Sequence, residues 1–273
     1  MSILKNITDN KRKEIEAAKK LVSVEDLKQS PFFARRCHSL KAALQGEGAS
    51  GIIAEYKTAS PSKGLINNTA EITEVVAGYV AAGASGISVL TDEKFFGGTI
   101  EDLAKARFAA KHTPILRKDF MLDEYQIYEA KAHGADVILL IAECLSGDEI
   151  ALLAAKAHEI GLEVLLEFHH GEELNKISKD IDIVGINNRD LSTFEVDIEA
   201  SIQLASQLPT DMIRISESGI SETETVRYLR SKGFQGFLMG ENFMKAEKPA
   251  EACREFIDRI TNCELGNPVR KSH

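Results

Sequence analysis

Acidic and basic side chains recur at the ends of short apolar runs in this sequence, where together they could transfer protons. Glu55 and Lys57 stand two residues apart, so on a strand they share one face. Lys118 ends another run, and a lysine in a partly apolar pocket can have its pKa lowered into the range of a general acid. Glu167 follows a third run, where a carboxylate is costly unless it is paired or catalytic. Taken singly, each is explained as well by a surface ion pair or a solvated cluster.

Two further pairs are less informative when they stand alone. Asn187 and Arg189 share one side of a run; an amide can orient a hydroxyl and an arginine suits a carboxylate or phosphate, although both residues also favour turns. The adjacent His169 and His170 invite a metal interpretation. Neighbouring residues on a strand face opposite ways, however, and cannot easily bind one ion together. We therefore expect no metal site.

Small residues after the last two apolar runs suggest a phosphate cradle. Ser218 and Gly219 follow the seventh run, and Gly240 and Glu241 follow the eighth. Backbone N–H groups can approach an anion closely at such residues, and the helix N-termini that come next favour negative charge. Glu241 suits this place only if its backbone N–H, and not its side chain, faces the ligand.

The elements that must position these residues are eight apolar runs, with helical spacing between them. Strand followed by helix, eight times, predicts a (β/α)8 barrel, in which the C-terminal strand ends converge on one mouth. A doubly wound sheet is the alternative, but its G-x-G-x-x-G turn is not found in the sequence. The runs are Gly51–Lys57, Gly86–Asp92, Pro114–Asp119, Asp136–Glu143, Glu163–His169, Ile183–Arg189, Met212–Ser218 and Gly236–Glu241.

A helical leader precedes the first run. Residues 4–21 have amphipathic spacing, and shorter helices are expected over 24–28 and 40–44. We expect one barrel domain over residues 1–273, with 1–48 as an N-terminal helical extension packed on it. Ser146 and Ser221 each precede a glutamate by three residues and predict capping boxes at two helix starts.

Composition excludes several classes of function. The chain has 273 residues, 44% of them hydrophobic and 27% charged, as in an ordinary globular protein. A net charge of −9 argues against nucleic-acid binding, and no apolar stretch approaches the roughly 20 residues of a membrane span. The four cysteines lack C-x-x-C spacing and no signal peptide is evident, so we expect reduced thiols and a cytoplasmic location. A monomer is the default expectation, because no long apolar surface stripe is seen.

In this order, the motifs resemble the indole-3-glycerol phosphate synthase family over nearly the whole chain. The family converts 1-(2-carboxyphenylamino)-1-deoxyribulose 5-phosphate into indole-3-glycerol phosphate with loss of CO2 and water, in tryptophan biosynthesis. The resemblance implies a phosphorylated small-molecule substrate and no metal or organic cofactor. The motifs are Ala54-Glu-Tyr-Lys57, Ser60-Pro-Ser62, Leu116-Arg-Lys-Asp-Phe120, Leu166-Glu-Phe-His169, Gly185-Ile-Asn-Asn-Arg-Asp-Leu191, Ser216-Glu-Ser-Gly-Ile220 and Phe237-Leu-Met-Gly-Glu241.

The resemblance also implies roles for the catalytic residues. Lys118 is the general acid of ring closure. Glu167 is the base of the later dehydration, and Lys57 is a candidate acid for it. Glu55 orients the lysines or shares in the proton transfers, and Asn187 holds a substrate hydroxyl or Glu167. Which lysine protonates which oxygen stays open, because closely spaced groups titrate as a coupled set.

Implied substrate-binding residues surround this set. Phe120 packs the aromatic ring, Arg189 supports an ion pair, and Ser60 belongs to a loop rich in hydrogen-bond donors. The phosphate-binding residues, which act through backbone groups with help from Lys57, are Ser218, Gly219, Gly240 and Glu241.

Some positions depart from the family or have no assigned role. Leu40 stands where an aromatic residue is usual, and Asn242-Phe243-Met244 replaces the commoner Ser-Leu-Met. Asp92 and Glu143, which end the second and fourth runs, are assigned no catalytic role. The competing interpretations are a phosphoribosylanthranilate isomerase, which would use a cysteine and an aspartate, and a non-catalytic binder of phosphorylated metabolites.

Overall fold

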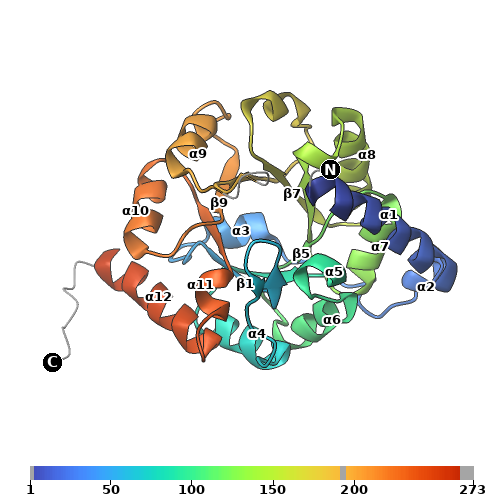
Figure 1. The fold of residues 1–273 in the computed structure, drawn as a ribbon, viewed down its shortest axis with the longest axis horizontal. Coiled ribbons are helices and arrows are strands. Elements are labelled where there is room, and N and C mark those ends of the chain that lie inside the picture. Colours follow the sequence, from blue (N-terminus) through green and yellow to red (C-terminus); the bar gives the residue numbers. More distant parts are fainter. Residues whose placement is uncertain (1–2, 191–194, 265–273) are drawn as a thin grey trace.

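The computed structural model describes residues 3–190 and 195–264, and its centre is a closed barrel of eight parallel strands (Figure 1). Each strand pairs with its neighbours in chain order, and β1 closes the barrel against β10. The strands are β1 (Ile52–Tyr56), β4 (Gly86–Leu90), β5 (Ile115–Lys118), β6 (Val137–Ile141), β7 (Glu163–Phe168), β8 (Ile183–Asn187), β9 (Ile213–Glu217) and β10 (Gly236–Met239). Each lies within a predicted apolar run, and the (β/α)8 fold is confirmed. A short antiparallel pair, β2 (Ala59–Ser60) and β3 (Gly64–Leu65), lies on the loop after β1.

Helices form a ring around the barrel (Figure 1). The long ones are α4 (Ile72–Ala81), α6 (Ile100–Ala109), α7 (Glu124–Ala132), α8 (Gly147–Glu159), α9 (Ile198–Ala205), α10 (Thr223–Ser231) and α12 (Pro249–Glu264). Shorter elements at the strand ends are α5 (Glu93–Phe96), η1 (Ala142–Cys144) and α11 (Glu241–Met244). No helix in the described part of the chain is long and apolar enough to cross a membrane.

One of the eight connections differs from the expected pattern. Between β7 and β8 the chain forms a 3₁₀ helix, η2 (Gly171–Lys176), in place of an α-helix. The capping box at Ser146 is confirmed, but the one at Ser221 is wrong, because α10 begins at Thr223 with Glu222 as its N-cap.

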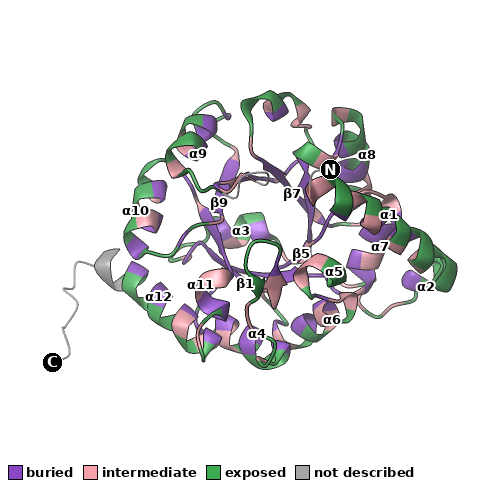
Figure 2. Cartoon of the chain, viewed as in Figure 1, coloured by how far each residue is buried: buried purple, intermediate pink, exposed green. Residues whose placement is uncertain are grey.

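Strand side chains alternate between two apolar layers, which is what directs the site residues inward. In β1, Ile52 and Ala54 pack outward in the layer shared with the helices, whereas Ile53 belongs to the cluster inside the barrel. Glu55 continues the inward series. Figure 2 shows buried strands at the centre and exposed outer faces on the helices.

The leader divides between the two ends of the barrel. Its long helix α1 (Ile3–Leu21) crosses the rim at the C-terminal strand ends and is followed by α2 (Val24–Leu27). The short helix α3 (Leu40–Gln45) closes the opposite end, where Leu40 packs against Gly86 at the start of β4. The three predicted leader helices are confirmed. Leu40, where an aromatic residue is usual, therefore lies away from the mouth.

Candidate active site

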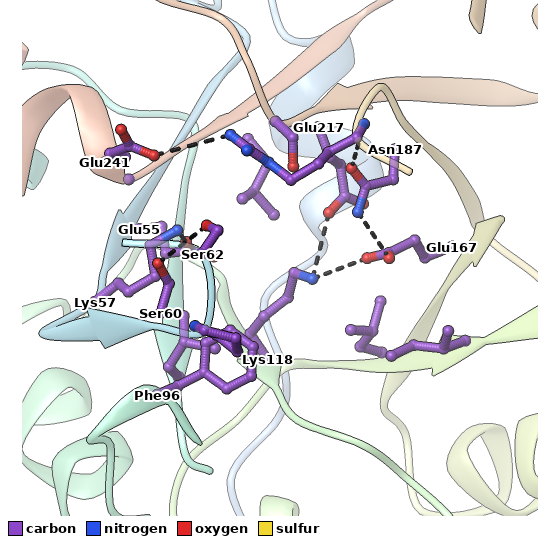
Figure 3. A pocket seen from close by; sticks show the side chains of 18 of the residues that line it. Glu55, Lys57, Ser60, Ser62, Phe96, Lys118, Glu167, Asn187, Glu217 and Glu241 are labelled. Carbon is purple, nitrogen blue, oxygen red and sulfur yellow. Dashed lines mark hydrogen bonds and ion pairs between the residues drawn. The ribbon is translucent and has the colours of Figure 1, made fainter. Parts of the chain in front are cut away.

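All twelve residues predicted for the site line one pocket at the C-terminal strand ends, part of which is drawn in Figure 3. The structure therefore brings the whole set together, while the individual roles stay predictions. The residues are Glu55, Lys57, Ser60, Lys118, Phe120, Glu167, Asn187, Arg189, Ser218, Gly219, Gly240 and Glu241.

Glu55 and Lys57 form an ion pair at the end of β1. Oε1 of Glu55 lies 3.0 Å from Nζ of Lys57, and Oε2 accepts a hydrogen bond of 3.2 Å from Ser88 of β4. Gly240 makes room for this carboxylate, because a Cβ there would lie 2.7 Å from Oε1. Glu55 is thus a buried support, and the partly exposed Lys57 is the member that can reach a ligand.

Lys118 reaches into the centre of the pocket and meets two carboxylates (Figure 3). Its Nζ lies 2.8 Å from Oε2 of Glu167 and 3.4 Å from Oε2 of Glu217. Burial disfavours the charged form, but the nearby carboxylates outweigh it and hold the pKa of Lys118 well above its usual value. The expectation of a lowered lysine pKa is therefore wrong. Lys118 is therefore a fixed positive charge between the two carboxylates.

The two carboxylates beside Lys118 have their pKa values pushed in opposite directions. Burial disfavours ionisation of Glu167, but Lys118, His169 and the hydrogen bond from Asn187 lower its pKa. Burial raises the pKa of Glu217, and repulsion from Glu167 adds to this against the attraction of Lys118. Two carboxylates that share one lysine cannot both ionise easily. The site therefore holds Glu167 as a carboxylate and favours Glu217 as a neutral acid.

Glu217 is the polar group that the sequence analysis missed. It ends β9 on the inward series that begins with Ile213 and Ile215. Gly185 of β8 accommodates it, since a Cβ there would lie 2.2 Å from Oε1 of Glu217. The alternation of this strand is a signal that could have found it. The motif was instead interpreted as a backbone anion site centred on Ser218.

The amide of Asn187 joins two neighbours: it donates to Glu167 and accepts from the backbone of Arg189. Nδ2 of Asn187 donates 3.0 Å to Oε1 of Glu167, and its Oδ1 accepts from the backbone N–H of Arg189 at 3.0 Å. Of the two predicted partners of Asn187, a substrate hydroxyl and Glu167, the hydrogen bond joins it to Glu167. The carboxylate of Glu241 has two cations near it. Its Oε2 lies 3.9 Å from a guanidinium nitrogen of Arg189, and its Oε1 lies 3.7 Å from Nζ of Lys63. Arg189 lines the end of the pocket where a phosphate is expected, and the exposed Lys63 lies outside the lining.

Ser218 and Gly219 hold the backbone in the left-handed region after β9, with φ of 67° and 72°. Among the described residues Ser218 alone has a positive φ without being glycine, and such strain gathers at functional sites. A side chain is excluded at Gly219, because a Cβ would lie 2.4 Å from Val196. The turn thus presents backbone to the pocket, as a phosphate cradle requires. On the other side, Asn242 lines the pocket, and Phe243 is buried beneath it.

The opposite wall of the pocket is apolar. Phe120 packs against Phe96 with ring centroids 6.1 Å apart. The leader helix α1 contributes Ile3, Leu4 and Ile7 to the same wall. Phe120 is predicted from the sequence, whereas Phe96 and the α1 residues are not, because their approach depends on how α1 docks.

A buried ion cluster docks α1. Nζ of Lys11 lies 3.0 Å from Asp92, 2.9 Å from Asp119 and 2.7 Å from Glu14. Burial opposes the charge on Lys11, but these carboxylates raise its pKa. Asp92, the strand-end residue without an assigned role, is therefore an anchor for the leader. Asp119 follows Lys118 directly, so the same cluster fixes the strand end that carries this lysine.

The described residues contain no group of three or more His, Cys, Asp or Glu side chains arranged to hold a metal ion. The chemistry that this pocket offers is proton transfer and charge stabilisation by two lysines and three glutamates, between an apolar wall and an anion-friendly turn.

Comparison with known proteins identifies the family. The family model described as indole-3-glycerol phosphate synthase matches residues 4–256. The chain belongs to the indole-3-glycerol phosphate synthase family. The indole-3-glycerol phosphate synthase of Bacteroides thetaiotaomicron is 51% identical over 258 residues, which are 94% of this chain and 98% of that protein. The one from Salinibacter ruber is 44% identical over 254 residues, 92% of this chain and 94% of that protein.

Solved structures with a similar fold are much less similar in sequence. Tryptophan synthase subunit alpha from Legionella pneumophila matches with a TM-score of 0.61 at 12% identity, covering 83% of this chain and 98% of that one. Thiamine phosphate pyrophosphorylase from Pyrococcus furiosus matches with a TM-score of 0.58 at 16% identity, covering 81% and 100%. These similarities support the barrel fold alone.

Membership of the indole-3-glycerol phosphate synthase family makes the chain an enzyme, a carboxy-lyase of tryptophan biosynthesis that acts on a phosphorylated small molecule. The predicted family is confirmed, and neither the isomerase nor the non-catalytic binder is the right interpretation.

Proposed function

We propose that the pocket at the mouth of the barrel carries out the synthase reaction with its own side chains. The substrate is 1-(2-carboxyphenylamino)-1-deoxyribulose 5-phosphate, and the products are indole-3-glycerol phosphate, CO2 and water. The observation that carries the proposal is the network in which Lys118 lies between Glu167 and Glu217, beside the Glu55–Lys57 pair. Simple binding would not need so many buried acids and bases in one pocket.

The two ends of the pocket suit the two ends of the substrate. The carboxyphenyl ring packs on the apolar wall around Phe120. The phosphate lies at the turn of Ser218 and Gly219 and at Gly240, where small residues expose backbone N–H groups. Arg189 and Ser60 complete this end, and Glu241 takes part through its backbone. The ribulose carbons then lie over the two lysines.

Ring closure and decarboxylation come first. The aryl carbon that bears the carboxylate attacks the ribulose carbonyl, and Lys118 gives a proton to the carbonyl oxygen. The ammonium also stabilises the negative charge that develops there, within a pocket that excludes much of the water. The carboxylate then leaves as CO2, and its electron pair restores the aromatic ring.

Dehydration completes the indole. Lys57 gives a proton to the new hydroxyl, which leaves as water, and Glu167 removes a proton from the neighbouring CH2. Glu55 keeps Lys57 charged and oriented, and Asn187 orients Glu167. Two lysines give protons and one glutamate takes one. Each turnover therefore draws one proton from solution, which replaces the carboxylate lost as CO2.

We also propose the wider properties expected of the chain. Residues 1–273 form one barrel domain with 1–48 as its helical extension, and the enzyme works as a cytoplasmic monomer. Neither a metal, an organic cofactor nor a nucleic acid takes part, since acids and bases of the chain suffice for every step.

A cofactor-free assay tests the function. Purified protein is mixed with the carboxyphenylamino-deoxyribulose phosphate in the presence of a chelator, and indole fluorescence is followed. The chain contains no tryptophan, so the product appears against a low background. We expect indole-3-glycerol phosphate and CO2 in equal amounts. No product at high enzyme concentration would refute the proposal.

A further inference from the structure

His169 is a buried polar side chain that the proposed steps leave unused. It follows β7 directly, and its side chain is only 3% exposed. Neither ring nitrogen has a hydrogen-bond partner among the residues that the structure describes. Buried polar groups are rarely left in this state without a reason.

Two carboxylates flank the ring at its two nitrogens. Nε2 lies 3.8 Å from Oε1 of Glu167, and Nδ1 lies 4.0 Å from Oε2 of Glu143. The side chain of Glu167 is 3% exposed within the pocket, whereas that of Glu143 on η1 is 39% exposed. The three side chains thus form a series from solvent to the active site.

We propose that His169 passes protons between Glu143 at the surface and Glu167 in the pocket. The inference rests on the proposed function, because the route returns to Lys118, through Glu167, the proton that this lysine gives away in ring closure. One ring nitrogen takes a proton from Glu143 while the other releases its proton to Glu167, so no electrons are exchanged. Both gaps exceed a hydrogen bond, and small shifts of the ring and of the two carboxylates close them.

The route ends at the general acid. Glu167 lies 2.8 Å from Nζ of Lys118, so a proton that reaches the carboxylate can pass to a lysine that has just given its own away. A bound substrate covers Lys118 from the mouth. The route through His169 reaches Lys118 from the side of the barrel. The lysine can therefore recover its proton while the substrate is still bound.

The other charged groups around the ring are already engaged. Oε2 of Glu173, on η2, accepts hydrogen bonds from the backbone N–H groups of His169 and His170. The ammonium of Lys176 donates to two backbone carbonyls near η1. Glu143 and Glu167 are therefore the carboxylates that face the ring nitrogens.

Chemical rescue tests the route. His169→Ala opens space beside Glu167, His169→Gln keeps most of the volume, and His170→Ala is the matched control on the exposed neighbour. We expect kcat of both His169 variants to fall about ten- to hundredfold in dilute buffer, at or below the lower end for direct acid–base groups. KM should change less than about twofold. Added imidazole should restore kcat of His169→Ala in proportion to its concentration and leave unmodified enzyme and His170→Ala unaffected.

Three outcomes would overturn the inference. The first is kcat of both His169 variants near that of unmodified enzyme. The second is a fall in kcat without buffer dependence, which marks a structural role. The third is unchanged kcat in Glu143→Gln, because the route would then not begin at that residue. The same assay measures the unmodified enzyme. If that enzyme forms no product, the proposed function itself is refuted.

Discussion

Lys118 and Glu167 hold each other in the charged state, and this sets what each can do. A lysine whose pKa is raised is a weak acid on its own. It can act as an acid when an oxyanion forms beside it during ring closure. The ammonium first stabilises the developing negative charge, and the oxyanion then accepts the proton. Glu217, favoured in its neutral form, lets Lys118 stay charged without a second negative charge nearby.

Removal of the ammonium tests this assignment. In Lys118→Ala we expect turnover to fall by about 10²–10⁴-fold, the range given to general acid–base groups, with substrate affinity largely kept. Steady-state kinetics and equilibrium binding of the substrate measure the two effects. Lys105→Ala, on the exposed surface of α6, is the control. Turnover near that of unmodified enzyme would show that another residue is the acid.

The raised pKa of Glu217 predicts a pH-dependent stability. An unfolded glutamate has a pKa of about 4.3. Since the folded value is higher, the folded state binds the extra proton between the two values, and stability falls as pH rises through the folded pKa. Glu217→Gln mimics the neutral form, so its melting temperature should exceed that of unmodified protein more at pH 9 than at pH 5. Exposed Glu172→Gln should show no such trend, and an equal difference at both pH values would contradict the assignment.

At the scale of elements, the docking of α1 decides whether the apolar wall is complete. Lys11 is the one point where this helix shares buried charge with Asp92 and Asp119. Loss of the lysine leaves two buried carboxylates facing each other. Breaking a buried pair in this way typically costs about 3–5 kcal/mol.

We therefore expect Lys11→Met to loosen α1 and to raise KM, since Ile3, Leu4 and Ile7 would no longer hold the substrate ring. Urea denaturation and steady-state kinetics measure the stability and the KM. The control is Lys13→Met, an exposed lysine of the same helix. If the two variants have the same KM, the cluster does not position the wall.

Features that depend on neighbours in the chain could be predicted from the sequence, whereas features that depend on contacts between distant residues could not. The strands were found because parallel strands covered by helices are continuous apolar runs. Most of the twelve site residues lie at the ends of those runs, whereas Ser60 and Phe120 lie beyond them and came from the family resemblance. The pKa of Lys118 was misjudged, because its partners come from β7 and β9 and their distances depend on barrel closure. Glu217 was missed for a different reason: the alternation of β9 directs it inward, but its motif was assigned to a backbone anion site at Ser218. The positions of α1 and α3 at opposite ends depend on tertiary packing that local patterns do not encode.

For the whole molecule, a second buried ion cluster stabilises the end of the barrel opposite the active site. Asp136 lies just before β6, at the end away from the mouth, and is fully buried. Its carboxylate binds Arg35 at 2.8 Å and Arg107, and it accepts backbone hydrogen bonds from His38 and Ile115 at 2.8 Å each. This hub ties the leader, α6 and two strands together.

We expect Asp136→Asn to lower the free energy of unfolding by about 3–5 kcal/mol, because two arginines lose their buried counter-ion. At temperatures where the variant stays folded, kcat should match that of unmodified enzyme, since the hub is remote from the mouth. Urea denaturation and initial-rate kinetics measure the two quantities. A large loss of kcat in fully folded variant would show that the two ends are coupled.

The pairing of β1 with β10 has a consequence for how the molecule becomes active. The two strands come from opposite ends of the barrel sequence, and Glu55 packs against Gly240 across their seam. Contacts between residues so distant in the chain form slowly, because a long loop must close first. Local helices can therefore appear early in refolding while the seam is still open. Enzymatic turnover should return only when β1 pairs with β10. The recovery of activity during refolding therefore reports the rate at which the barrel closes.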